Sequence, residues 1–396
     1  MSKALDGIRV LDLTTYEAGP SCTEMLGWLG AEVIKIEPPS GETSRREMSE
    51  RPDMDSWFFI LLNANKKSVT LNLKSERGRT MFEQLVAKTD VLVENLAPGS
   101  MDRLGLGYER LREINPRIIA ASVKGFGSTG PYAKFKSFEP IAQAMGGAIS
   151  VNGTADEPMR INAGLGDTGA GMHLAIGILA AIVQRQATGV GQRVEVAQQD
   201  AVMNLIRIRF RDTYMTGKAT PRGSSVTGTA PSNLYRCRPF GPNDYVFITC
   251  NSAEMWKALV GVLGQPELAD DPRFKDRASR GKHEKDIDAL IEAWTEKRTK
   301  QEVMEALGTA GVPCGAVLDT AELLADESLA ERGMMAPVEH PTRGRFIMPA
   351  NPVLLSESPT EVTPAPLLGE HNDEVYSELL GLTPEDLRAL KSQGAI

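Results

Sequence analysis

The stretch IRVLDLTTYEAGPSCTEMLGWLGAEVIKIE, residues 8–37, decides the fold class of this chain. It opens and closes with short, apolar, β-branched runs at 8–13 and 31–37, which are typical of buried strands. Between them, the run CTEMLGWLG has the amphipathic pattern of a helix. Strand, helix and strand in this order predict a βαβ unit, and therefore a parallel sheet covered by helices.

Similar apolar runs continue the pattern toward the C-terminus. We expect further strands at SVTLNL (68–73), DVLVEN (90–95), IIAASVKG (118–125) and QRVEVA (192–197). Helices fill the intervals, and the longest is predicted to begin after Asp167 and to stop at Gly189, because glycine commonly ends a helix. Residues 1–215 therefore predict a large doubly wound parallel-sheet domain, an α/β domain of Rossmann-like type.

The composition changes after this domain. Residues 216–231, which contain GKATPRGSSVTGTAP, are rich in Gly, Ser, Thr and Pro, as expected of a linker or active-site loop. Strand and helix patterns over 232–328 predict a smaller α+β domain. Residues 329–396 hold Pro-rich stretches and a last helix, and we expect this C-terminal segment to return to the large domain.

Length and composition narrow the class of protein. A chain of 396 residues with 41% hydrophobic content can bury the cores of two domains. We find no signal-peptide pattern and no run of 18 apolar residues, so we expect a cytoplasmic protein outside the membrane. The net charge of −8 argues against a nucleic-acid partner. The scattered cysteines and histidines predict neither a metal site nor a disulfide framework: Cys22, Cys237, Cys250, Cys314, His173, His283, His340 and His371.

Two loops are candidates for the chemistry. The loop LTTYEAGPSC at 13–22 contains neither GxGxxG nor a P-loop, which argues against a nicotinamide or ATP enzyme. The segment AGLGDTGAG at 163–171 surrounds a single carboxylate, Asp167, with glycines just before the long helix. Asp167 is either an N-cap, the commoner role for such a residue, or a nucleophile that a bulky substrate can approach because its neighbours lack side chains.

Several long motifs lead to one family. They are LDGIRVLDLT, GAEVIKIEPP, NKKSVTLNLKSERGR, VENLAPGSMDRLGLGYE, KGFGSTGPYA, the segment 164–212 and LLGEHNDEVY. Through them, the chain resembles the family III CoA-transferases, also called the CaiB/BaiF family, over essentially its full length. The resemblance implies an interlocked homodimer, in which each chain forms an open ring threaded by its partner and each active site lies between the two subunits.

The resemblance also implies a mechanism, with Asp167 as nucleophile. An Asp with its reference pKa of about 3.9 is ionised at neutral pH and needs no general base. It would attack an acyl-CoA to give a mixed anhydride, and the returning thiolate would give an aspartyl-CoA thioester that the acceptor carboxylate attacks. Backbone N–H groups of glycine-containing loops are the expected oxyanion donors. CoA and acyl-CoA enter only as substrates, without a metal or a permanently bound cofactor.

Binding roles follow by resemblance. The expected CoA-binding residues are Glu17, Ala18, Leu71, Lys74, Asn95, Leu96, Arg103 and Lys136, and the expected substrate-binding residues are Tyr16, Phe138, Glu139, Gly228 and Thr229. Taken without the resemblance, the lysines and the arginine are more often solvated surface charges. Compared with the oxalate branch of the family, Pro38 stands in place of an arginine, Glu17 in place of a glutamine, residues 44–48 in place of a tryptophan region and VTGTA at 226–230 in place of a polyglycine loop.

These departures leave the substrate open. We expect a small dicarboxylate such as oxalate or succinate, because Arg45, Arg46 and Lys136 could accommodate a second carboxylate. The alternative within the fold is an α-methylacyl-CoA racemase, but the histidine of that branch is replaced by Phe138, so the acid/base pair is incomplete. A non-catalytic CoA-binding protein is the alternative from another class, and the presence of Asp167 argues against it.

Overall fold

The computed structural model describes residues 3–47, 49–223 and 230–396, and the chain forms two compact units. Unit 1 comprises Met1–Ile149, Arg160–Thr220 and Ser328–Ile396. Unit 2 comprises Ser150–Met159 and Pro221–Glu327. Each unit is held together by apolar clusters of its own.

Six parallel strands form the sheet of unit 1, in the order β3-β2-β1-β4-β5-β6. They are β1 (Arg9–Leu13), β2 (Glu32–Glu37), β3 (Lys66–Thr70), β4 (Val91–Glu94), β5 (Ile119–Lys124) and β6 (Arg193–Ala197). Strand β1 pairs with both β2 and β4, so that Val10 lies between Val33 and Val91. The predicted parallel sheet is thus confirmed. The strand order reverses at β1, and open sheets of this kind bind ligands at the carboxyl ends of the strands beside that point.

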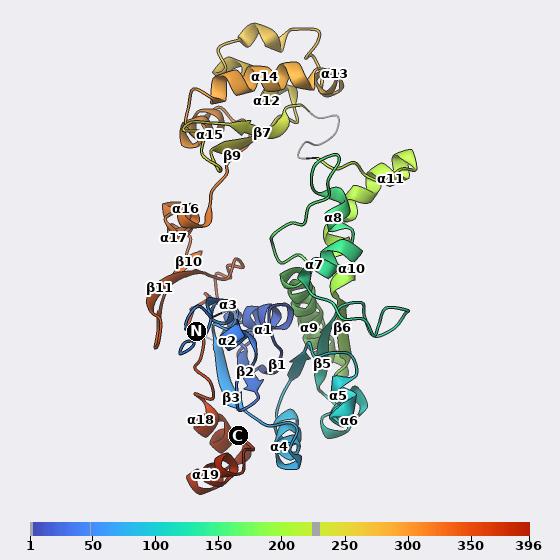
Figure 1. The fold of residues 1–396 in the computed structure, drawn as a ribbon, viewed down its shortest axis with the longest axis vertical. Helices are drawn as coiled ribbons and strands as arrows, with labels where there is room; N and C mark the ends of the chain where they lie inside the picture. The colour runs from blue at the N-terminus through green and yellow to red at the C-terminus, as the bar shows by residue number, and fades with distance from the viewer. Residues whose placement is uncertain (1–2, 48, 224–229) are drawn as a thin grey trace. The chain divides into compact units, whose positions relative to one another are not determined.

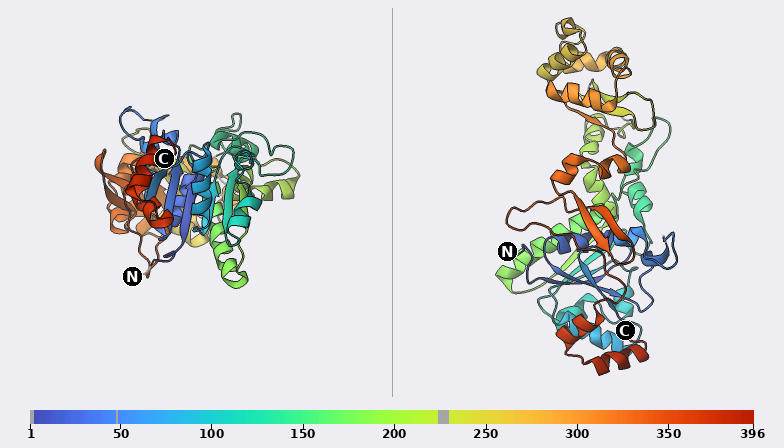
Figure 2. Two further views of the ribbon diagram at one scale, coloured as in Figure 1. Left: turned by 90° about the horizontal axis from the view of Figure 1, so that it is seen from below. Right: turned by 90° about the vertical axis from the view of Figure 1, so that its left-hand side faces the viewer.

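Adjacent residues of each strand contribute to two different cores, because side chains alternate across a strand. Val10 packs with α1 and α9 on one face of the sheet. Leu11 belongs to the core of the other face, which α4, α6, α18 and α19 cover (Figures 1 and 2). These helices are α1 (Ala18–Trp28), α4 (Glu76–Val86), α6 (Tyr108–Ile114), α9 (Thr168–Thr188), α18 (Asn372–Leu380) and α19 (Pro384–Ser392).

The C-terminal segment packs against β3, the edge strand of the sheet. The Thr70 N–H donates to Asn372 Oδ1 at 2.8 Å, and the Tyr376 hydroxyl donates to the Thr70 carbonyl at 2.7 Å. The side chains of Ala395 and Ile396 are buried in the same core as α4. In Figure 1, α18 and α19, in red, lie beside β3 and α4. Residues of the C-terminal segment therefore form hydrogen bonds with backbone groups of the edge strand β3.

Shorter elements complete unit 1. They are α2 (Ser44–Glu47), α3 (Trp57–Ile60), α5 (Ser100–Arg103), α7 (Glu139–Met145), α10 (Gln198–Leu205), η1 (Arg207–Arg209), α11 (Phe210–Thr216), β10 (Met335–His340) and β11 (Gly344–Pro349). Two more short helices, α8 (Ala148–Val151) and α17 (Glu327–Glu331), each span a boundary between unit 1 and unit 2 in the sequence. Strands β10 and β11 pair as an antiparallel hairpin. Helices α7 and α10 begin close to the start of α9, and this arrangement forms the candidate site.

Unit 2 has a three-stranded antiparallel sheet in the order β7-β8-β9, packed against helices. Its core includes Trp256, Tyr235 and two buried cysteines, Cys237 and Cys250. Helix α15 begins with a capping box between Thr299 and Glu302. The elements are β7 (Ser232–Arg236), β8 (Tyr245–Thr249), β9 (Cys314–Ala316), α12 (Ala253–Val262), η2 (Pro266–Ala269), α13 (Arg277–Lys282), α14 (Glu284–Thr295), α15 (Lys300–Thr309) and α16 (Thr320–Leu324).

The described parts of the chain contain neither a candidate membrane-spanning helix nor a candidate metal site. No described helix combines the length and the apolar character that crossing a bilayer needs. Nor does any group of His, Cys, Asp or Glu side chains within residues 3–47, 49–223 and 230–396 have the arrangement of a metal site.

Candidate active site

Four polar side chains of unit 1 meet where four helices begin. Glu17 is the N-cap residue of α1, and Asp167 is the N-cap residue of α9. Glu139 and Gln198 are the first residues of α7 and α10. Because the first turn of a helix carries partial positive charge and unpaired N–H groups, this arrangement favours negatively charged groups.

Asp167 occupies the N-cap position without capping the helix. Its side chain accepts no hydrogen bond from the first turn of α9, so the N-cap explanation is wrong for the side chain. Instead, Oδ1 accepts a hydrogen bond from Nε2 of Gln198, and the Asp167 N–H donates to Oε2 of Glu139 at 2.5 Å. Among the residues that the structure describes, Oδ2 accepts no hydrogen bond. One carboxylate oxygen is therefore held, and the other is free to react.

The charge state of Asp167 depends on two neighbouring glutamates. Burial, followed by the negative charges of Glu17 and Glu139, raises the pKa of Asp167 to about 7, and the hydrogen bond from Gln198 opposes this rise. Burial also raises the pKa of Glu17, against a hydrogen bond of 2.8 Å that Thr168 Oγ1 donates to Glu17 Oε1. The expectation from the reference pKa is thus corrected, because a pKa of about 7 leaves part of the Asp167 carboxyl groups protonated at neutral pH.

The glycines before Asp167 let the glutamates approach. A Cβ atom on Gly164 would lie 2.1 Å from Glu17 Oε1. A Cβ atom on Gly166 would lie 2.6 Å from the Cβ of Ala142 and 3.1 Å from Glu139 Oε2. These glycines therefore make room for protein groups at the site, a role that the sequence analysis did not assign to them.

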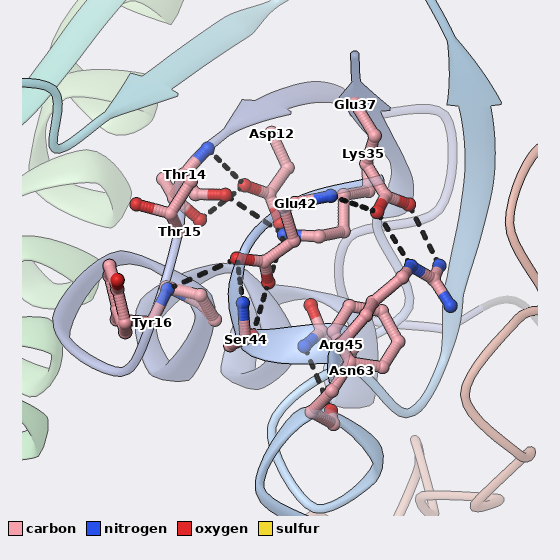
Figure 3. Close-up of polar contacts among 12 residues, drawn as sticks. Asp12, Thr14, Thr15, Tyr16, Lys35, Glu37, Glu42, Ser44, Arg45 and Asn63 are labelled. Carbon is pink, nitrogen blue, oxygen red and sulfur yellow. Dashed lines mark hydrogen bonds and ion pairs between the residues drawn. The ribbon is translucent and has the colours of Figure 1, made fainter. Parts of the chain in front are cut away.

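A buried network of charges holds the loop that leads to Glu17 (Figure 3). Asp12 Oδ1 accepts a hydrogen bond from the Thr14 N–H at 2.9 Å, and Lys35 Nζ donates to the Thr14 carbonyl at 2.9 Å. Burial alone would raise the pKa of Asp12, but the ammonium groups of Lys66 and Lys35 outweigh it and hold this pKa well below its usual range. Lys66 Nζ lies 3.0 Å from Asp12 Oδ2. The buried charges of Asp12, Lys35 and Lys66 thus hold the backbone of the loop that carries Glu17.

Tyr16, the residue before Glu17, has a left-handed backbone with φ 61°. Its hydroxyl donates to Glu47 Oε2 at 2.8 Å, and its ring meets that of Phe138 edge-on, with 6.2 Å between centroids. The Phe138 side chain is 59% exposed. The structure therefore brings together four of the expected residues, Tyr16, Glu17, Phe138 and Glu139, around Asp167.

Arg45 has a different role from the expected one. Its side chain is 1% exposed and donates to Glu37 through Nε and Nη2, at 2.6 and 2.8 Å, and to Asp55 through Nη1 at 2.6 Å. Its guanidinium carbon also lies 3.8 Å from the ring centre of Phe59. The expectation that Arg45 grips a substrate carboxylate is wrong, because its charge is already neutralised inside the protein.

The expected CoA-binding residues fall into separate groups. The side chain of Asn95 binds the backbone of Thr15 through two hydrogen bonds. Its Oδ1 accepts from the Thr15 N–H at 2.9 Å, and its Nδ2 donates to the Thr15 carbonyl at 2.7 Å. The Leu96 carbonyl accepts from Lys124 Nζ at 2.7 Å. Ala18 is buried at the start of α1, and Leu71 packs in the core behind β3. Lys74 is exposed after β3.

Arg103 and Lys136 line one cavity of about 890 Å³ beside β4 and β5. Its further cationic residues are Lys124, Lys134 and Arg193. Lys124 is paired with Glu94 at 2.8 Å, whereas Arg103 donates to neutral oxygen atoms of Pro98 and Ser100. Leu71 and Lys74 do not line this cavity. The expected residues Gly228 and Thr229 lie outside the described residues.

Gln198 and Thr168 are not among the site residues predicted from the sequence. Gln198 directly follows the strand predicted at 192–197, and the carboxyl ends of parallel strands are where such sheets bind their ligands. That position was the only signal in the sequence. Which side chain meets Gln198 depends on the packing of α9 against α10, which the sequence pattern does not give.

Comparisons with known proteins agree with one another. Residues 5–372 match the family model described as CoA-transferase family III. A formyl-CoA:oxalate CoA-transferase of Streptomyces coelicolor is 46% identical over the whole length of both chains. One of Rhodopseudomonas palustris is 41% identical over all of this chain and 98% of its own.

Solved structures give the same result. A CAIB/BAIF family protein from Brucella suis has a TM-score of 0.85 at 30% identity, covering 96% of this chain and all of its own. A hypothetical protein from Mycobacterium tuberculosis has a TM-score of 0.80 at 29% identity, covering 94% of this chain and 99% of its own.

Proposed function

The chain belongs to CoA-transferase family III, and we propose that this CoA-transferase moves CoA from formyl-CoA to oxalate or a closely related small dicarboxylate, with Asp167 as nucleophile. The observation that carries the proposal is the Asp167 carboxylate, with one oxygen bonded and the other free, at the start of a long helix. The names of the relatives from Streptomyces and Rhodopseudomonas support the substrate pair.

The reaction begins at Oδ2 of Asp167. This oxygen attacks the thioester carbon, the C–S bond breaks, and CoA thiolate leaves while a mixed anhydride forms. The thiolate then attacks the aspartyl carbonyl carbon and releases the donor acid as its carboxylate. The acceptor carboxylate attacks the aspartyl carbon of this thioester, the C–S bond breaks, and a second mixed anhydride forms as thiolate leaves. The thiolate then attacks the acyl carbon of the acceptor, the bond from this carbon to the bridging oxygen breaks, and the acceptor acyl-CoA is released. Asp167 is thereby restored, and no proton or electron is gained or lost overall.

The cavity beside β4 and β5 supports the binding of CoA. Arg103 and Lys136 line it together with Lys134, and arginine and lysine are the usual partners of phosphate groups. We therefore propose that it receives the phosphates of CoA, although the net charge of the chain is −8. Salt should weaken this binding, because exposed charges are screened over about 8 Å at physiological ionic strength.

Exposed apolar side chains support a dimer. The α9–α11 region carries large exposed side chains, among them Ile176 (65%), Val183 (67%), Ile208 (70%), Tyr214 (83%) and Met215 (75%). Isolated soluble proteins rarely expose so many large apolar groups along one region, and such surfaces usually contact a partner. We propose that a second copy of this chain covers them. Sedimentation at micromolar concentration should give the mass of a dimer, and a monomer would contradict this.

The contacts of His173 favour the transferase over a racemase. His173 is the histidine on α9, but its ring nitrogens contact the Gly169 carbonyl at 2.6 Å and Asn204 Nδ2 at 2.7 Å. Neither contact involves Asp167, so this histidine does not supply the second base of a proton exchange.

Trapping of the intermediates tests the proposal. The protein is incubated with formyl-CoA, acetyl-CoA or succinyl-CoA, treated with hydroxylamine and mapped by peptide mass spectrometry. A hydroxamate on Asp167 with formyl-CoA, and oxalyl-CoA after addition of oxalate, are the expected results. Asp167→Asn is the control that should stay unlabelled. An unlabelled wild-type protein that exchanges α-protons of branched acyl-CoA in heavy water would instead indicate a racemase.

A further inference from the structure

Gln198 holds one oxygen of Asp167 from a buried position. It is the first residue of α10, directly after β6, and its side chain is 6% exposed. Its Nε2 donates to Asp167 Oδ1. In the next residue, Gln199, Nε2 instead donates a hydrogen bond to the Met145 carbonyl at 3.0 Å. Two adjacent glutamines on one helix thus differ in a single respect that matters here: only the first contacts Asp167.

The two oxygens of Asp167 have different fates in the proposed reaction. When Oδ2 attacks the donor, Oδ1 becomes the carbonyl oxygen of the anhydride and later of the thioester. When a thiolate or an acceptor carboxylate attacks the aspartyl carbon, the negative charge develops on Oδ1. A donor that is already aimed at this oxygen lowers the barrier most, because it needs no rearrangement during the reaction.

We propose that the side-chain amide of Gln198 is the oxyanion donor for the aspartyl carbonyl and that it selects Oδ2 as the attacking oxygen. This inference rests on the proposed function, since it requires an acylated Asp167. It differs from the expectation that backbone N–H groups of glycine-containing loops are the oxyanion donors. The N–H groups of Asp167 and Gly169 are already bonded, to Glu139 Oε2 and to the Gly164 carbonyl at 2.8 Å.

Gln198→Met tests the proposal, because methionine has a similar length but cannot donate. We expect kcat to fall about 100-fold or more, as for other single oxyanion donors. Gln199→Met is the matched control on the same helix and should keep kcat within about twofold of the wild type. Rapid quenching with hydroxylamine should find more acylated Asp167 in Gln198→Met than in the wild type, because the steps that resolve the anhydride and the thioester are slowed.

A second readout separates a catalytic role from a structural one. Gln198 stabilises the ionised form of Asp167, so Gln198→Met should move the acid limb of the kcat/KM profile to higher pH. Gln198→Glu, which keeps the shape of the side chain and adds negative charge, should move it further and also lose activity. Circular dichroism establishes that the variants are folded, and Gln198→Glu carries the test if Gln198→Met is not.

The outcomes distinguish this inference from the proposed function. A wild-type protein that is never labelled on Asp167 overturns the function and the inference together. A labelled wild type with wild-type kcat and an unchanged pH profile in Gln198→Met overturns the inference alone. Equal losses in Gln198→Met and Gln199→Met also overturn it, because they indicate a general effect on α10.

Discussion

Replacing Glu17 by glutamine should extend the activity of this transferase toward acid pH. In the proposed mechanism Asp167 must be ionised to attack, and the negative charge of Glu17 is the second cause, after burial, of its raised pKa. Glutamine keeps the size of the side chain and its acceptor oxygen for Thr168, so the loop contacts should survive. Removal of the charge lowers the pKa of Asp167, because a like charge disfavours the ionised form.

The expected size follows from the pKa of Asp167. With a pKa of about 7, about one tenth of the Asp167 carboxyls are ionised at pH 6. Burial and Glu139 remain in the variant, so we expect a pKa of about 6 rather than a return to the reference value, and about half would then be ionised. The variant should therefore gain about fivefold at pH 6 relative to its own plateau, and little at pH 8.

The assay is kcat/KM for formyl-CoA at saturating oxalate, measured from pH 5 to pH 9 by chromatography of the acyl-CoA products. The midpoint of the acid limb carries the test, because the height of the plateau also reflects any contact of Glu17 with substrate. Glu357→Gln, at an exposed glutamate outside the site, is the matched control and should leave the midpoint unchanged. A midpoint in Glu17→Gln equal to that of the wild type would refute the electrostatic reasoning.

Four further predictions concern activity and stability. Asp167→Asn should keep the fold, because Oδ1 still accepts from Gln198, and should lose about 10⁴-fold in kcat; loss of the circular dichroism spectrum would contradict this. Arg45→Met should lower the free energy of unfolding in urea by about 3–5 kcal/mol, since Glu37 stays buried without its partner; a loss below about 1 kcal/mol would count against the network. Lys136→Ala should raise KM for acyl-CoA about tenfold with kcat nearly unchanged, and an unaltered KM would remove the cavity from CoA binding. Burial raises the pKa of Glu24 from 4.5 to about 8, so the wild type should lose stability as the pH rises through this range, whereas thermal denaturation of Glu24→Gln should show a smaller loss; parallel curves would contradict it.

The parallel sheet could be predicted because its central strands are buried on both faces and are therefore apolar runs in the sequence. The bounds of β5 and β6 fall inside the runs at 118–125 and 192–197. Charged residues within the apolar runs at 8–13 and 31–37 were a further signal that was not used in the prediction. Asp12 and Lys35 interrupt two apolar strands, and a buried charge requires a partner. Their partners could not be assigned, because pairing depends on which strands become neighbours.

The position of the candidate site could be predicted from the sequence, but the pKa of its carboxylate could not. The start of the long helix at Asp167 follows from the glycines and the apolar run, and the helix does begin there. The raised pKa could not be inferred, because it arises from glutamates 150 and 28 positions away in the sequence, Glu17 and Glu139. Arg45 is a case in which the predicted role was wrong. We expected it to accommodate a substrate carboxylate, but it forms an ion pair with Glu37 at the end of β2.

Because the C-terminal segment packs on β3, the edge of the sheet can be completed only late in translation. The hydrogen-bond partners of Thr70 are Asn372 and Tyr376, which are synthesised 302 and 306 residues later. At about 5–20 residues per second, translation takes about 15–60 s to supply them. During this time the nascent chain carries an open sheet edge and the uncovered apolar face of α4, both of which promote aggregation. Production of this protein should therefore benefit from chaperones that shield nascent chains, and slower translation should increase aggregation, because α18 and α19 complete unit 1 only after the rest of its sheet has been synthesised.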